Sequence, residues 1–285
     1  MIAIQAVGSR NIRPGEQPDL KAEFKALTNR VNRRADRFIT LALIGACQAI
    51  AGKKLPAETG VFMTSGQGNL AVFNRICEQK YIEKHLPKPV DFINLLSNSA
   101  GFYVASELGF NGRNLFLSHH AFAVQMSLLL ARTDLKRGKQ KDVLIGGVDE
   151  MIEPYSFTRK FLGLGRETVL GEGSNWMLLS DCAAGAIATL EVIPRIMTRE
   201  EIASSLASCD RHTQAAFGLR FNAEEAEALC DSSRVQRFAY EKECGFYETV
   251  PFFAMNHFIQ TSAGSLLFID QFEGRYMVMR VNRRS

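Results

Sequence analysis

Side chains that could act as nucleophiles, bases or metal ligands are sparse in this 285-residue chain. No CxxC pair occurs among the six cysteines, which lie at positions 47, 77, 182, 209, 230 and 244. The histidines lack the spacing of metal ligands, since the adjacent pair His119 and His120 would point to different sides of a helix or strand. The sequence therefore predicts no metal site and no bound cofactor.

Two other motifs could carry chemistry. Cys244, next to Gly245, is the best-placed thiol for a nucleophile, but no His or Asp partner can be identified for it. A free buried cysteine usually behaves as a small hydrophobe. The Gly-rich turn Ser65-Gly-Gln-Gly68 lacks the Gly-Lys-Ser/Thr ending that grips a triphosphate. We therefore expect both motifs to be structural.

Composition and charge narrow the class of protein. With 46% hydrophobic and 22% charged residues, the chain matches a folded protein of one large domain or two fused halves. The net charge is +4, and the basic residues do not form the stripe that nucleic-acid binding needs. The N-terminus lacks a signal-peptide pattern, and no apolar run reaches the length of a membrane span. We expect a cytoplasmic protein without a nucleic-acid partner or membrane span.

Strands and helices alternate along the first half of the chain. Short apolar runs typical of strands cover 2–8, 60–64, 114–117 and 142–145. Helical spacing of apolar residues covers 35–51, 69–84, 92–108 and 120–135, whereas 10–33 is polar and predicts an irregular arm. This alternation favours an α/β class with parallel βαβ units. The helix at 120–135 is apolar nearly all round and should lie between two layers.

The pattern changes after about residue 150. Residues 175–179 and 184–192 indicate two paired strands, and Thr198-Arg-Glu-Glu201 is a capping box that opens a short helix. The remaining predicted elements are a helix over 247–260 and strands over 265–269 and 276–281, with a turn at Glu273-Gly274.

Four stretches resemble β-ketoacyl synthases, in the same order along the chain. They are Ala35-Asp-Arg-Phe38, Leu95–Ala100 with Glu107-Leu-Gly109, Gly112–Asp149, and Gly171-Glu-Gly173. The resemblance covers residues 1–192 and implies a thiolase-like layered αβαβα fold. Residues 1–192 would form its ketosynthase-like N-terminal half. Residues 193–285 would form an abbreviated C-terminal half of the same domain.

The same resemblance implies where a nucleophile should lie. Ketosynthases place a Cys at the N-terminus of the buried helix, where the helix dipole and free N–H groups lower the thiol pKa. Counting without gaps from Gly112 to Gly138 puts this position at Ala121, which cannot attack a thioester. The family also uses two histidines in its C-terminal half, and neither His212 nor His257 has the expected motif. The chain therefore resembles an inactive member.

Inactive chains of this kind resemble chain length factors, and the short form most resembles those of aryl polyene type II polyketide clusters. The resemblance implies a heterodimer with an active β-ketoacyl synthase that acyl carrier protein serves. The inactive subunit would be non-catalytic and would help to line the acyl tunnel. Candidate tunnel or interface residues are Phe92, Leu95, Leu96, Phe102, Tyr103, His119, His120 and Phe122.

Two other functions stay open at this point. The chain could be a stand-alone acyl-thioester hydrolase or acyltransferase that uses Cys244 or His119, or a pure scaffold of a polyketide assembly. Phe102 and Tyr103 could also be plain core residues, because aromatic residues at helical spacing commonly are. For His119 and His120 we expect buried, hydrogen-bonded and neutral rings.

Overall fold

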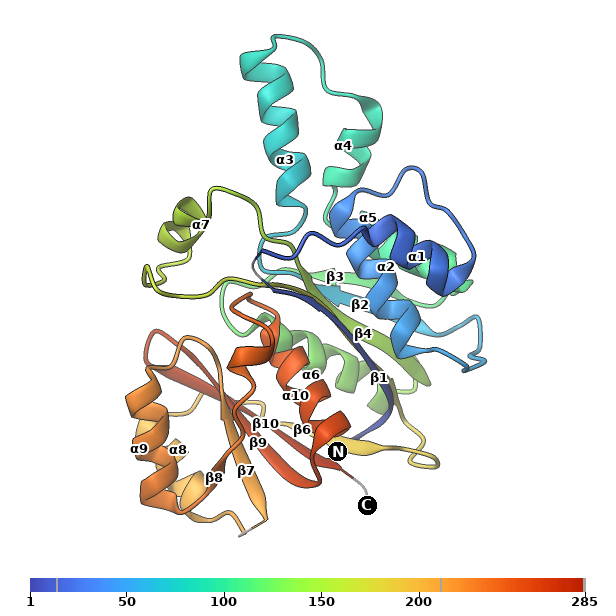
Figure 1. The fold of residues 1–285 in the computed structure, drawn as a ribbon. Helices are drawn as coiled ribbons and strands as arrows, with labels where there is room; N and C mark the ends of the chain where they lie inside the picture. The colour runs from blue at the N-terminus through green and yellow to red at the C-terminus, as the bar shows by residue number, and fades with distance from the viewer. Residues whose placement is uncertain (14, 211, 284–285) are drawn as a thin grey trace.

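Ten strands form one mixed sheet in the computed structural model, which describes residues 1–13, 15–210 and 212–283. Their order across the sheet is β3-β2-β4-β5-β1-β6-β10-β9-β7-β8 (Figure 1). The strands are β1 (Ile2–Ile12), β2 (Gly60–Thr64), β3 (Asn114–Leu117), β4 (Asp142–Asp149), β5 (Glu172–Ser180), β6 (Ala188–Val192), β7 (Thr213–Phe217), β8 (Gln236–Arg237), β9 (Gly264–Phe272) and β10 (Arg275–Arg283).

The sheet consists of two halves with the same topology. In sequence order the first five strands are arranged 3-2-4-5-1, and strands six to ten repeat this arrangement as 8-7-9-10-6. In each half three strands are parallel and the last two run antiparallel to their neighbours. Antiparallel pairing of β1 with β6, in which Ile2 faces Leu190, joins the halves. The chain is therefore built from one topology used twice.

The helices complete five layers. They are α1 (Leu20–Thr28), α2 (Arg37–Ala49), α3 (Leu70–Cys77), α4 (Pro89–Leu95), α5 (Ser99–Leu108), α6 (Ala123–Lys136), α7 (Tyr155–Phe161), α8 (Arg199–Ala207), α9 (Ala223–Ser233) and α10 (Val250–Thr261), with short helices η1 (Glu78–Ile82) and η2 (Glu241–Glu243). Helices α6 and α10 pack in one buried cluster between the sheet halves. Outside them, α1, α2 and α5 cover the first half, and α8 and α9 cover the second. The expected layered α/β class is confirmed.

Burial from both sides explains the composition of the two central helices. Nine of the twelve residues of α10 are buried, and α6 buries residues on several faces. The polar exception in α10 is Asn256, whose amide donates to the carbonyls of Gly8 and Trp176 and to the Ser9 hydroxyl at 3.0–3.1 Å. These bonds attach the helix to β1 and β5 and satisfy the amide NH₂ inside the core, whereas its Oδ1 has no hydrogen-bond partner among the described residues.

Several sequence predictions were wrong about how elements pair or end. The strands β5 and β6, predicted to pair, are separated by β1, which bonds to both. The predicted irregular arm contains α1, which Asp19 caps by accepting from two backbone N–H groups, and Pro14 lies outside the described residues. The single helix predicted over 92–108 is two helices, because Leu96 adopts an extended conformation. Four elements, α7, β7, α9 and β8, have no counterpart among the predicted ones.

Candidate functional site

The residue at the start of α6 is held in a strained backbone conformation. Phe122 is the N-cap and lies in the left-handed region, with φ 57° and ψ 37°, and its ring is buried. A bulky residue at positive φ is uncommon and costs free energy. A strained residue between a strand and a helix is the geometry with which enzymes expose a nucleophile. Here the bend carries a phenyl ring, and Ala121, the position reached by gapless counting, precedes it by one residue.

A small cavity lies beside this bend, between the two halves of the molecule. The first half contributes Gly66, residues 119–122 and the first turn of α6, and the second contributes the loops after β7 and before α10 and the end of β9. Its volume is about 50 Å³. Since one water needs roughly 10–15 Å³, the cavity has room for a few waters and is too small for an acyl chain.

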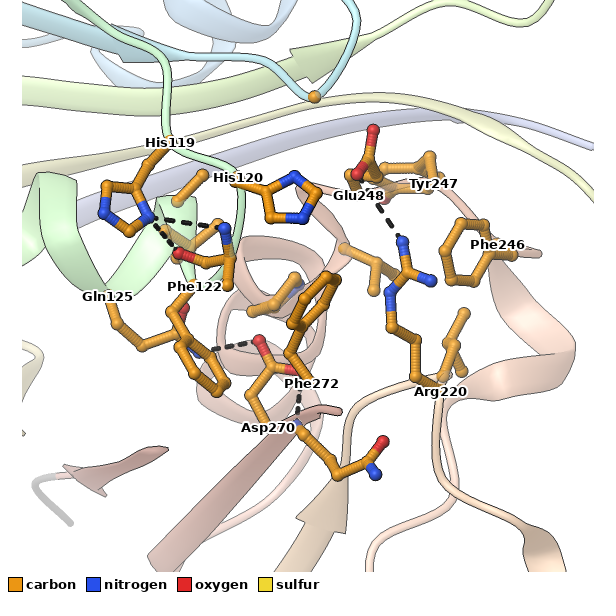
Figure 2. A pocket seen from close by; sticks show the side chains of 18 residues that line it. His119, His120, Phe122, Gln125, Arg220, Phe246, Tyr247, Glu248, Asp270 and Phe272 are labelled. Carbon is orange, nitrogen blue, oxygen red and sulfur yellow. Dashed lines mark hydrogen bonds and ion pairs between the residues drawn. The ribbon is translucent and has the colours of Figure 1, made fainter. Parts of the chain in front are cut away.

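Charged side chains of the second half fill much of the site (Figure 2). Arg220 lies 3.6 Å from Glu248 and stacks on the rings of Phe246 and Phe272, at 5.3 and 5.4 Å. Burial raises the pKa of Glu248 to about 7, an effect that Asp149 strengthens and Arg220 opposes. Arg220 therefore lies beside a carboxyl that is only partly ionised at neutral pH, and two aromatic rings lie within cation–π distance of its guanidinium.

A second polar contact joins α6 to the end of β9. The Gln125 amide donates to the Asp270 carboxyl at 2.8 Å, and the backbone N–H of Gln271 donates to the same side chain at 3.0 Å. Burial raises the pKa of Asp270, which these bonds and Arg220 oppose. The pair connects the two halves at the base of the cavity.

The histidines are not where the sequence analysis put them. His119 and His120 are exposed at the mouth of the cavity instead of buried, with the His120 ring edge-on to Phe272 at 5.0 Å. They lie in the irregular stretch between β3 and α6 and not on a helix packed between layers. His257 stacks on Phe253 within α10, and neither it nor His212 is among the residues that line the cavity.

Cys244 has the properties of a structural thiol. Its side chain is fully buried and lies 3.9 Å from the Tyr240 carbonyl. Burial raises its pKa far above the ordinary value for cysteine, and Glu241 and Glu243 add to this effect. The thiolate that would attack an acyl group is therefore strongly disfavoured.

The structure brings together only some of the residues predicted to line the tunnel or the interface. His119, His120, Ala121 and Phe122 line the cavity. Away from it, on or next to α4 and α5, lie Phe92, Leu95, Leu96, Phe102 and Tyr103; of these Leu95 and Tyr103 are half-buried and the others exposed. Sequence reasoning missed Arg220, Phe246, Glu248, Asp270 and Phe272. One signal in the sequence could have found part of this set, because Gly245-Phe-Tyr-Glu-Thr249 resembles the end of a ketosynthase-like chain.

A family model, "Beta-ketoacyl synthase, N-terminal domain", matches residues 7–160, which is more than half of the chain. The chain belongs to the β-ketoacyl synthase family. No curated protein sequence matches it significantly. The matched segment includes the bend at Phe122. It does not include the residues that the second half contributes to the site.

Solved structures support the fold of this family member over nearly its whole length. "The ishigamide ketosynthase/chain length factor" aligns with a TM-score of 0.74 at 16% identity, over 100% of this chain and 99% of that one. A type II PKS acyl carrier protein in complex with its ketosynthase bound to the hexaketide, AntDE:AntF, gives 0.68 at 9%, covering 99% of both chains. The synthase FabH from Pseudomonas aeruginosa PAO1 gives 0.59 at 16%, covering 99% and 98%. The predicted thiolase-like α/β fold is confirmed.

Two absences hold for residues 1–13, 15–210 and 212–283. No helix there is long and apolar enough to cross a membrane. Within the same residues, no group of three His, Cys, Asp or Glu side chains could hold a metal ion.

Proposed function

We propose that the chain is a non-catalytic chain length factor that pairs with an active β-ketoacyl synthase in type II polyketide biosynthesis of the aryl polyene kind. The observation that carries the proposal is the phenyl ring of Phe122 at the bend where a nucleophile is expected. Of the described residues that line the adjacent cavity, none is a cysteine, and the second half contributes no histidine. A ketosynthase-family fold is thus retained without the groups that form and cleave a thioester.

Two features support a partner subunit of the same fold. Strand β3 is the last strand at its end of the sheet, and its outer edge has no partner among the described strands. Leu115, Phe116 and Leu117 in it are half-buried, while Phe102 of the adjoining helix α5 is 63% exposed. Unpaired edges and exposed apolar groups are normally covered. The acyl carrier protein would then reach the active site of the partner.

The isolated chain is expected to lack condensing and thioester-cleaving activity, and Phe122→Cys is expected not to restore either. A thiol at the bend would still lack a histidine from the second half to stabilise the oxyanion and enolate. The measurement is release of thiol from malonyl and acyl thioesters, with Phe122→Ala as the matched variant. Turnover by the wild-type chain that Cys244→Ala or His119→Ala abolishes would show an enzyme and overturn the proposal.

Replacing Phe102 with alanine is expected to lengthen the products of the reconstituted pair. The cavity at α6 is too small for an acyl chain, so we propose that the tunnel forms between the subunits, where Phe102 is exposed. Burying one more two-carbon unit at about 0.8 kcal/mol per CH₂ shifts a product ratio roughly tenfold.

Mass spectrometry of carrier-bound products measures this length, and size exclusion checks that the pair stays intact. Phe157→Ala, at an equally exposed phenylalanine on α7, is the control and should leave product length unchanged. Because Phe102 is exposed, its truncation should alter the unfolding free energy of the chain by less than about 0.5 kcal/mol. Unchanged products with both variants would indicate a scaffold role instead of a tunnel.

A further inference from the structure

One surface segment carries exposed apolar side chains that the proposed pairing does not use. Residues 151–171, here called the α7 segment, connect β4 to β5, and α7 stands to one side of the layered body (Figure 1). Only Thr158 of α7 is buried, and α7 makes no extensive contact with another helix or strand of the described chain. The α7 segment therefore adds little to the core of the domain.

Hydrogen bonds to backbone carbonyls hold the α7 segment in place. The Leu164 N–H donates to the Arg159 carbonyl at 2.8 Å, and Arg159 Nε donates to the Thr168 carbonyl at 2.9 Å. Arg220 Nη1 donates to the Leu162 carbonyl at 3.0 Å and so attaches the segment to the second half of the molecule. These bonds position the segment without using its most exposed apolar side chains.

Two phenylalanine rings of α7 are open to solvent on the same side of the helix. Phe157 is 67% exposed and Phe161 is 71% exposed. Residues four positions apart are neighbours on a helix surface, so the two rings form one apolar strip. Val169, in the chain that returns to β5, is also exposed. Exposed apolar groups that lie together mark an interaction surface.

The charges next to this strip are positive. Residues 154–166 contain Arg159, Lys160 and Arg166 and no acidic residue, although one acidic residue borders the stretch on each side. Lys160 and Arg166 are exposed. None of the three cations forms a salt bridge with a described residue. The α7 segment thus combines exposed aromatic rings with unpaired positive charge, which favours an anionic partner.

We propose that the α7 segment attaches the chain reversibly to an anionic membrane surface, with Phe157 and Phe161 inserted at the boundary between headgroups and acyl chains. Helices that lie in this boundary combine apolar side chains on one face with Lys and Arg that contact anionic headgroups. A second protein chain fits less well, because the buried centre of a protein interface is depleted of charged residues. The attachment does not depend on the proposed pairing, which uses β3 and α5.

The test is co-sedimentation of the full chain with vesicles of equal parts phosphatidylglycerol and phosphatidylcholine. Burying one phenylalanine side chain shifts an equilibrium roughly tenfold or more, so the double variant Phe157→Ala, Phe161→Ala should lower the partition coefficient on the order of 100-fold. Each basic side chain near an anionic surface contributes roughly fivefold, so the double variant Lys160→Gln, Arg166→Gln should lower it on the order of 25-fold. Vesicles of pure phosphatidylcholine should bind the wild-type chain weakly by the same reasoning.

Two control variants remove apolar surface or charge elsewhere on the chain. Ile196→Ala shortens an exposed side chain in the second half of the molecule, and the double variant Lys21→Gln, Lys25→Gln removes two exposed charges from α1. Because neither lies in the α7 segment, each should leave the partition coefficient within about threefold of wild type. Circular dichroism and melting temperatures confirm that these exposed variants fold.

Several results would overturn the membrane attachment. Absence of wild-type binding to the anionic vesicles does so, and so does binding that the phenylalanine variant leaves unchanged. Equal losses in the segment variants and the controls would mean adsorption through net charge alone. If the wild-type chain binds no vesicles but binds acyl carrier protein through Lys160 and Arg166, the surface serves a carrier protein and the membrane role is wrong.

Discussion

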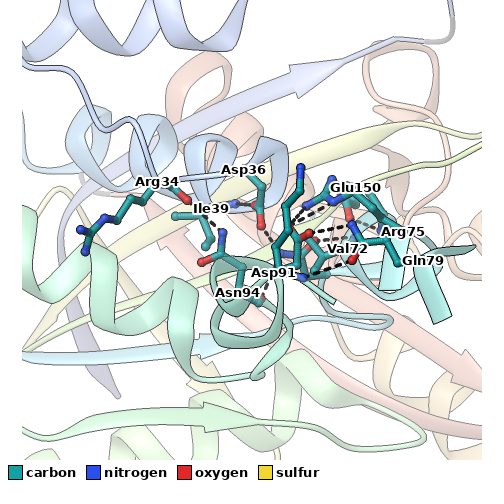
Figure 3. Close-up of polar contacts among 12 residues, drawn as sticks. Arg34, Asp36, Ile39, Val72, Arg75, Gln79, Asp91, Asn94 and Glu150 are labelled. Carbon is teal, nitrogen blue, oxygen red and sulfur yellow. Dashed lines mark hydrogen bonds and ion pairs between the residues drawn. The ribbon is translucent and has the colours of Figure 1, made fainter. Parts of the chain in front are cut away.

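Replacing Glu150 with glutamine is expected to remove much of the pH dependence of stability between about pH 5 and 8. Glu150 is buried; its Oε1 accepts from the backbone N–H of Ala71 in the first turn of α3, and its Oε2 has no hydrogen-bond partner among the described residues (Figure 3). Burial, helped by the nearby carboxylates of Asp36 and Glu172, raises its pKa to about 8 against the opposing effects of the Ala71 hydrogen bond and Arg37. The side chain is therefore a neutral acid at neutral pH.

The sign of the effect follows from proton counts. Between about pH 4.5 and pH 8 the folded chain keeps a proton on Glu150 that the unfolded chain has released, so the unfolding free energy falls as pH rises. The stabilisation is complete below the unfolded pKa and lost above pH 8. At 1.36 kcal/mol per pKa unit, the loss is on the order of 3–5 kcal/mol. Glutamine has the shape of the neutral acid and does not titrate, so Glu150→Gln should be the more stable chain at pH 8.

Denaturant unfolding at pH 5.5, 7 and 8.5 measures this difference. The control is Glu167→Gln on an exposed loop, which should leave the pH profile of the wild-type chain unchanged. Glu248, with a pKa of about 7, contributes with the same sign and keeps part of the slope in the Glu150 variant. Parallel profiles for the wild-type and Glu150→Gln chains would refute the buried neutral acid.

Asp149→Ala is expected to lower the unfolding free energy by about 3–5 kcal/mol. The fully buried Asp149 carboxyl accepts from the Ser65 hydroxyl at 2.9 Å and from the backbone N–H groups of Gly66 and Thr249 at 2.8 Å each. It thus connects the end of β4 to the turn after β2 and to the start of α10. Alanine leaves three donors without an acceptor, and the two buried ones, the Ser65 hydroxyl and the Thr249 N–H, each cost roughly 1–3 kcal/mol.

The asparagine variant sharpens this test. Asp149→Asn keeps the shape but turns an amide NH₂ toward a backbone N–H donor, so it should recover only part of the lost stability. Asp142→Asn, at the other end of the same strand, is the control and should stay within about 0.5 kcal/mol of wild type. Thermal and denaturant unfolding measure all three variants. An alanine variant within 1 kcal/mol of the wild-type chain would mean that this carboxyl does not hold the two halves together.

The predictions of strands, helices and caps were correct where residues close in sequence determine the structure. The strands at Gly60–Thr64 and Asn114–Leu117 have the predicted bounds, and Thr198 with Glu201 forms the predicted capping box. Because residues 120–135 are apolar nearly all round, their helix was predicted to lie between two layers, and the structure confirms this. These features depend on side-chain periodicity and short-range hydrogen bonds, which a single sequence displays directly.

The sequence by itself determined the α/β class, the resemblance to ketosynthases and the absence of a cysteine near residue 121. Only the tertiary structure decided that β1 separates β5 from β6, that Phe122 occupies the bend, and that Arg220, Glu248 and Asp270 complete the cavity. It also showed that α4 buries Asp91 and leaves Phe92 and Ile93 exposed. The physical reason is the sequence separation of the contacts. Strand order and the meeting of loops from the two halves depend on contacts between residues more than a hundred positions apart, and the periodicity of a sequence does not reveal such contacts.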